Sequence, residues 1–228
     1  MPRTDTTHTT AMDVLLCTLG LGPTYARLAS QFAADVAKLI PGERVLVATD
    51  CPEALASQGG AIVVRRERQG RGPYHEKRFA LEAALARAST AIFVDADTRV
   101  LRPFSMPTNW SAGFTERPGS HESMLRHLER EPANRLPLVA SAANELGVDI
   151  EATEWLGESL FAVTADAGRE QEFLREWGYL AGYFEAHGLC SGEGLAMGLA
   201  AARVGWRVNE EPLPVLQAAL THLNASAR

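Results

Sequence analysis

The chain has 228 residues, a length that predicts one domain large enough to bury a hydrophobic core. Its apolar share of 46 % and charged share of 22 % are typical of globular proteins, and its net charge of −6 excludes a general nucleic-acid binder, which would be basic. Three cysteines without metal-ligand spacing predict reduced thiols in a cytoplasmic protein. We expect no secretory signal, no membrane span, and one domain over residues 1–228 with residues 1–12 flexible.

The first half alternates strands with helices. Short apolar runs predict strands at 14–19, 44–49 and 61–65, and helical spacing of apolar residues predicts a helix up to residue 39 that begins behind an N-cap at Thr24. The basic stretch 65–72 has two interpretations, a solvated loop or an arginine loop that reaches an anionic ligand.

A second helix is predicted over 74–89, followed by the continuously apolar run 91–94. Such a run is typical of a central strand that is covered on both faces. Lys77 lies on the buried stripe of that helix, four residues before Leu81, so its ammonium must reach either water or an anion.

The second half continues the alternation less regularly, and its elements are predicted as strands at 110–115, 159–164 and 206–209 and helices at 121–130, 138–146, 170–186 and 194–203. The order of elements along the whole chain predicts the α/β class.

Two aspartates follow the predicted central strand. Asp95 and Asp97 are two positions apart, so on an extended chain both carboxylates point to the same side. The carboxyl end of a buried strand opens into the crevice where α/β sheets bind ligands. Carboxylates there are typical ligands of Mg²⁺ or Mn²⁺, which stabilise a departing nucleoside diphosphate. The pair therefore predicts a metal site, with a solvated turn as the alternative.

Lys77-Arg78 on the helix and the run 91–98, Ala-Ile-Phe-Val-Asp-Ala-Asp-Thr, together resemble the nucleotide-sugar-dependent glycosyltransferases of the GT-A fold. The resemblance covers most of the chain. It implies that Asp97 binds the metal directly, that Asp95 contacts both metal and ribose, and that Lys77 or Arg78 contacts the donor.

The first strand is similar to the nucleotide pocket of the same family. Thr18 and Gly20 at its end and Tyr25 in the next helix match residues that cradle the base. The resemblance implies a Rossmann-type mixed sheet flanked by helices, a nucleoside diphosphate sugar donor that we expect to be UDP-linked, and an acceptor hydroxyl on a glycan, lipid-linked sugar, protein or small molecule. Because several of these families supply a third metal ligand near the C-terminus, His222 is a further candidate ligand.

A narrower likeness links the stretches 116–120 and 155–158 and the acid Glu193 to the blood-group-type retaining galactosyl- and N-acetylgalactosaminyltransferases. It implies that Glu193 is catalytic, either stabilising positive charge on the sugar or acting as a base on the acceptor hydroxyl; helix capping is the alternative. The segment 191–194 reads Ser-Gly-Glu-Gly where that family has His-Asp-Glu-Ser, and one arginine is missing from the first stretch. Glu158 and His187 are candidates for acceptor binding, with an edge-loop acid and a histidine beside a helix-ending glycine as the alternatives.

Three rival functions share parts of this pattern. A haloacid-dehalogenase-type phosphatase also places Asp-x-Asp after an apolar run, but this chain has Arg99 where that motif has threonine or valine, and it contains no adjacent aspartates. A sugar nucleotidyltransferase needs a glycine-rich loop with an arginine, which 19–23 lacks. The remaining alternative is a non-catalytic relative that binds a nucleotide sugar or serves as a scaffold.

Overall fold

The computed structural model describes residues 12–70 and 72–225 and is built on a six-stranded sheet with the strand order β3-β2-β1-β4-β9-β6. These strands are β1 (Met12–Gly20), β2 (Val45–Thr49), β3 (Ala61–Arg65), β4 (Ala88–Val94), β6 (Gly113–Glu116) and β9 (Leu160–Thr164). The strands from β1 to β4 are parallel, and β9 runs antiparallel to both β4 and β6. The carboxyl ends of β1, β2, β4 and β6 therefore meet the start of β9 at one edge of the sheet.

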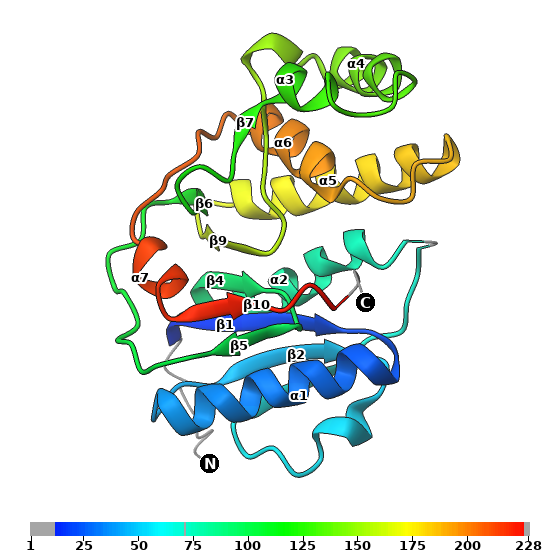
Figure 1. The fold of residues 1–228 in the computed structure, drawn as a ribbon. Helices are drawn as coiled ribbons and strands as arrows, with labels where there is room; N and C mark the ends of the chain where they lie inside the picture. The colour runs from blue at the N-terminus through cyan, green and yellow to red at the C-terminus, as the bar shows by residue number, and fades with distance from the viewer. Residues whose placement is uncertain (1–11, 71, 226–228) are drawn as a thin grey trace, which may run out of the picture.

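Helices cover both faces of this sheet. They are α1 (Gly22–Leu39), α2 (Lys77–Leu85), α3 (Met124–Leu128), α4 (Arg135–Leu146), α5 (Arg169–Ala186), α6 (Glu193–Arg203) and α7 (Pro214–Gln217), with short 3-10 turns η1 (Pro52–Leu55), η2 (Tyr74–Glu76) and η3 (Ile150–Ala152). Figure 1 shows α1 on one side of the sheet and α5 and α6 on the other, with α3 and α4 outside them. The predicted α/β class, with a mixed sheet flanked by helices, is confirmed.

The core consists of two clusters, one on each face of the sheet. Along β4 the side chains alternate, so Phe93 packs toward α2 and α5 whereas Ile92 packs toward α1. On the first face Phe161 stacks between two other phenylalanines, with ring centroids 5.3 Å from Phe93 and 5.2 Å from Phe114. Because both clusters share this sheet, the described residues form a single domain.

Two further strand pairs lie outside the main sheet. β5 (Thr98–Val100) pairs antiparallel with β10 (Leu220–His222), and β7 (Glu122–Ser123) pairs antiparallel with β8 (Glu154–Trp155). At two or three residues each, these strands are too short to show a hydrophobic period, which is why the sequence pattern did not predict them.

Some predicted boundaries are wrong, each because a tertiary contact overrides the local pattern. Helix α1 begins at Gly22 rather than behind Thr24, because the Asp50 carboxylate accepts a hydrogen bond from the Gly22 amide (2.7 Å). The helix predicted over 74–89 starts with a 3-10 turn and ends at Leu85, so that the chain can enter β4.

In the second half, the helix predicted over 121–130 is reduced to α3 because the two residues before it join β7. The strand predicted over 206–209 is reduced to one bridge between Asn209 and Thr115.

Three expectations about the whole chain can be compared with the structure. None of the described helices is long and apolar enough to cross a membrane. The cysteines Cys17, Cys51 and Cys190 are free thiols, as predicted. The flexibility expected for residues 1–12 concerns mainly residues 1–11, which lie outside the described residues.

Candidate functional site

The two aspartates of the predicted metal site lie where β4 leaves the sheet. The Asp95 amide still donates to the carbonyl of Ser159 (2.9 Å) next to β9, and the Thr98 amide then donates to the carbonyl of Asp95 (3.1 Å). The chain therefore turns here instead of continuing as the extended strand that the sequence pattern implied. Because of this turn the two side chains converge at the carboxyl edge of the sheet.

His222 joins them from the other end of the chain. The pairing of β10 with β5 sets His222 opposite Thr98 and brings its Nε2 within 2.9 Å of Asp97 Oδ1 and 3.7 Å of Asp95 Oδ2. One ligand atom from each of the three side chains lies within 4.8 Å of the others. The backbone amide of Ala225 also donates to Asp97 Oδ2 (2.7 Å), so the C-terminal segment holds Asp97 in place.

This donor set fits a divalent cation. Carboxylate oxygens suit Mg²⁺ and Mn²⁺, and an imidazole nitrogen is compatible with Mn²⁺. Burial raises the pKa of Asp95, and Lys77 on the other side of the carboxylate opposes that shift. Asp95 is therefore both a candidate metal ligand and the ion-pair partner of a buried ammonium.

Lys77 is the cation at the centre of a buried acidic cluster. Its Nζ lies 2.9 Å from Asp95 Oδ1 and 3.0 Å from Glu193 Oε1, and it donates to the backbone carbonyl of Glu158 (2.9 Å). Burial opposes its charge, but Asp95 and Glu193 outweigh burial and raise the pKa of Lys77 above its ordinary value. The sequence pattern required an anionic partner for Lys77 if its ammonium was to be buried, and the structure supplies two, Asp95 and Glu193.

Glu158 and Glu193 are the other two acidic residues near Lys77. The Glu158 carboxylate accepts a hydrogen bond from the Gly194 amide (2.8 Å) at the start of α6. Burial, together with the negative charge of Glu193, raises the pKa of Glu158 to about 8. Glu193 is only 2 % exposed. In this arrangement the Glu193 carboxylate and the backbone carbonyl of Glu158 both contact Lys77.

A cavity of about 380 Å³ adjoins the three candidate metal ligands. Its polar lining consists of Lys77, Asp95, Asp97 and His222 together with Tyr25, Asp50, Arg68 and Tyr74. Burial and the nearby charge of Asp97 raise the pKa of Tyr25. The cavity combines the three candidate metal ligands with the aromatic side chains of Tyr25 and Tyr74, a lining that suits a ligand with both an anionic and a planar part.

Two predicted nucleotide contacts have packing roles in the structure. Thr18 is fully buried in β1. A Cβ on Gly20 would come within 3.1 Å of Ala26 and Ala29, so this glycine lets α1 pack closely on β1. The cavity lining at this point is supplied instead by Leu19 and by Tyr25.

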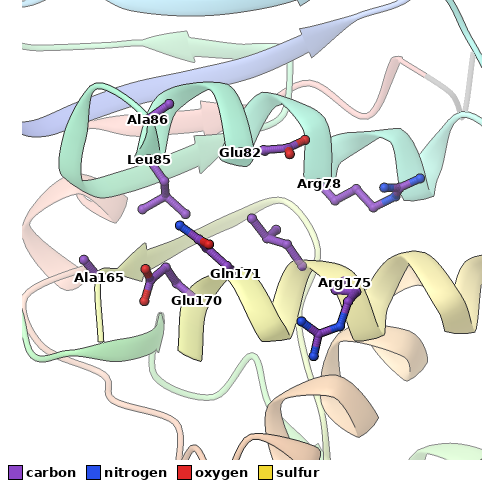
Figure 2. A pocket seen from close by; sticks show the side chains of 9 residues that line it. Arg78, Glu82, Leu85, Ala86, Ala165, Glu170, Gln171 and Arg175 are labelled. Atoms are coloured by element: carbon purple, nitrogen blue, oxygen red, sulfur yellow. The ribbon is translucent and has the colours of Figure 1, made fainter. Parts of the chain in front are cut away.

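Arg78 lies apart from its neighbour Lys77 in space. Its guanidinium carbon is 3.7 Å from the centre of the Phe79 ring, and it lines a separate cavity of about 540 Å³ between α2 and α5 (Figure 2). Arg175 in that cavity forms ion pairs with Glu172 and Glu176 of its own helix. Of the two basic residues that the resemblance offered as donor contacts, the structure brings only Lys77 to the aspartates.

His187 lies at the exposed C-terminal end of α5. Its Nδ1 is 2.8 Å from the carbonyl of Tyr183, and its ring packs on the ring of that tyrosine. This local contact matches the interpretation of His187 as a helix-ending histidine; its role in acceptor binding stays a prediction.

The stretch 116–120 carries a buried acid at the same sheet edge. Burial raises the pKa of Glu116 to about 7, and a Cβ on Gly157 would come within 2.0 Å of Glu116 Oε1. Gly157 therefore lies directly against the Glu116 carboxylate, which brings the two segments of the narrower likeness together in space.

Sequence reasoning missed Asp50 and Tyr74 as cavity residues. Asp50 directly follows β2, and the same argument that selected Asp95 could have found it, because both strands end at the same edge. Tyr74 precedes α2 in a 3-10 turn and has no comparable signal. Among the protein-family models and the curated proteins that were compared, no significant match to this chain was found.

Proposed function

We propose that this protein is a metal-dependent glycosyltransferase of the GT-A type that uses a nucleoside diphosphate sugar, expected to be UDP-linked. The observation that carries the proposal is the gathering of Asp95, Asp97 and His222 in the lining of a cavity of about 380 Å³. Those three residues would hold Mn²⁺ or Mg²⁺. Such a cation supplies Lewis-acid stabilisation of the negative charge that develops on the diphosphate leaving group.

Neighbouring residues hold the two aspartates of the candidate metal site in fixed positions. Asp97 is held by the amide of Ala225 and by His222, while Asp95 is held by the ammonium of Lys77. Side chains fixed by such partners need little rearrangement when a ligand binds, which favours both affinity and catalysis. Tyr25 lies across from Asp97 and offers an aromatic surface to the nucleoside.

Glu193 is our candidate for assisting attack by the acceptor hydroxyl. Its Oε1 lies 3.0 Å from Lys77 Nζ, and its side chain is buried, so acting on an acceptor requires that this ion pair opens. The burial of Glu193 is also the one observation that favours the alternative function, a non-catalytic protein that binds a nucleotide sugar. In that alternative Glu193 only holds Lys77 in position.

The donor site is tested by thermal unfolding with UDP, GDP, CMP or dTDP, each with and without Mn²⁺. A ligand at one hundred times its dissociation constant stabilises the folded state by about 2.7 kcal/mol. We expect one nucleoside diphosphate to raise the unfolding temperature only when Mn²⁺ is present, and Asp97→Asn to abolish the rise. Asp13→Asn, which changes an exposed aspartate on β1, is the matched control and should respond like the wild type.

Transfer and simple binding are then distinguished by donor turnover. The wild type incubated with the sugar form of the binding nucleotide and Mn²⁺ should release free nucleoside diphosphate, slowly to water and faster once an acceptor is supplied. Binding without any release supports the non-catalytic alternative. If none of the four nucleotides changes the unfolding temperature, the proposed function is wrong.

A further inference from the structure

The loop between β3 and η2 places one arginine, Arg68, in the lining of the cavity. This loop is the basic stretch for which the sequence left two interpretations, a solvated loop or an arginine loop that reaches an anion. Arg68 shares the lining with Tyr74 and Pro73, which follow it in the chain, and with Tyr25 from α1. The structure therefore favours the second interpretation.

The loop is anchored by hydrogen bonds to two carboxylates, those of Glu76 and Glu185. Glu76 Oε1 accepts hydrogen bonds from the amides of Gln69 (3.2 Å) and Gly70 (2.9 Å), and the Gly72 amide donates to Glu185 Oε1 (3.0 Å). A Cβ on Gly72 would lie 2.0 Å from the carbonyl oxygen of Cys190, so only glycine allows this approach. These contacts hold the backbone around Arg68 in a defined position beside the cavity.

The cavity lining contains two cationic side chains, Lys77 and Arg68, which differ in how far their charge is already paired. Lys77 is engaged by Asp95, Glu193 and the carbonyl of Glu158. Arg68 Nε donates to the carbonyl of Gly70 (3.0 Å), and within residues 12–70 and 72–225 no ion pair or hydrogen bond engages its terminal nitrogens. One contact thus orients the side chain, and its two terminal nitrogens, which can bind two phosphate oxygens at once, stay available.

We propose that Arg68 binds the diphosphate of the nucleotide and makes the cavity selective for diphosphates over nucleosides. This inference rests on the proposed function and extends it by naming a specificity-determining residue. Three carboxylates, Asp50, Asp95 and Asp97, line the cavity and disfavour an anion. A divalent cation at one end offsets part of that charge, and Arg68 adds a second positive centre for the phosphate chain.

The test compares Arg68→Gln and Arg68→Lys with the wild type by calorimetric titration at saturating Mn²⁺. The probes are UDP, uridine and, as a probe without a base, inorganic pyrophosphate. We expect Arg68→Gln to weaken binding of UDP and pyrophosphate by about tenfold, as befits loss of one charge-assisted contact, and to leave uridine unchanged. Arg68→Lys should lose less, because it keeps the charge without the paired donors. Arg65→Gln, which alters an exposed arginine paired with Glu67, is the control and should bind every probe like the wild type.

The outcomes separate this inference from the proposed function. Suppose that the wild type binds UDP with Mn²⁺ and that Arg68→Gln binds UDP and pyrophosphate as tightly as the wild type does. This result overturns only the role of Arg68. An equal loss for uridine and UDP also overturns it, since Arg68 would then act through the shape of the cavity. A wild type that binds none of UDP, GDP, CMP and dTDP, and no pyrophosphate, in the presence of Mn²⁺ overturns the proposed function, and this inference falls with it.

Discussion

Glu158, Glu193 and Lys77 form a buried group in which two acids share one positive neighbour. Burial and the charge of Glu193 raise the pKa of Glu158 to about 8, so Glu158 keeps its proton at neutral pH. Protonation relieves repulsion between two acids that contact one another. The protonation state of Glu158 therefore contributes to the stability of this cluster of side chains.

A pH dependence of stability follows from Glu158. Because its folded pKa of about 8 lies above the ordinary 4.5, the folded chain binds a proton that the unfolded chain releases. This contribution to the free energy of unfolding is fully present below pH 4.5 and is lost as the pH rises to about 8. Glu158→Gln should flatten the decline, as measured by urea unfolding at pH 5 and pH 8.5.

Glu116 has the same sign of shift and is the natural comparison. Its pKa of about 7 means that Glu116→Gln should remove only the part of the decline that occurs below pH 7. Equal declines in Glu158→Gln and the wild type would show that Glu158 is ionised in the folded protein.

At the scale of elements, the pairing of two three-residue strands completes the candidate metal site. β5 follows Asp97 directly and β10 ends at His222, so their antiparallel pairing sets the distance between these side chains. The Leu223 amide continues the ladder by donating to the carbonyl of Asp97 (2.9 Å). The backbone at Leu223 is thus part of what holds His222 in place.

Leu223→Pro should lower the affinity for Mn²⁺ because proline lacks the amide hydrogen that bonds Asp97. We expect a loss of roughly ten- to hundredfold, the usual effect of disturbing the support of a metal ligand. Leu223→Ala keeps the amide and should bind Mn²⁺ like the wild type, since this leucine is 36 % exposed. Calorimetric titration with Mn²⁺ measures both. Equal affinities in the two variants would mean that the ladder does not position His222.

At the scale of the whole molecule, β9 joins the parallel part of the sheet to β6. Phe161 on β9 stacks between Phe93 on β4 and Phe114 on β6, so one side chain links three strands. The core on this face continues from these rings to α5 and α6. The two ends of the sheet should therefore unfold together.

Phe161→Ala should lower the free energy of unfolding by about 3–5 kcal/mol, because it leaves a cavity at the centre of the core. The denaturant transition should stay single. Leu101→Ala changes a side chain that is 64 % exposed and should shift stability by less than about 0.5 kcal/mol. Two separate transitions in the wild type or in Phe161→Ala would contradict the single core.

Sequence patterns determined the features that depend on neighbours along the chain. The apolar run before Asp95 predicted a covered strand and placed both aspartates at the carboxyl edge of the sheet. The helical period placed Lys77 on a buried face where it needed an anion. Residues 77 and 78 differ by about 100° around a helix, so they face different directions and only Lys77 lies on the buried face. The resemblance, in contrast, offered either residue as a contact to the donor.

Only the tertiary structure decided which distant residues meet. His222 contacts Asp97 across 125 positions in the chain, through strands too short to produce a periodic pattern. Glu193 approaches Lys77 because the start of α6 is hydrogen-bonded to Leu156 and Glu158. Arg68 enters the cavity because Glu76 and Glu185 anchor its loop. The physical reason is that a strand or helix is set by local periodicity, whereas a site is set by packing between elements, and packing leaves no spacing in the sequence.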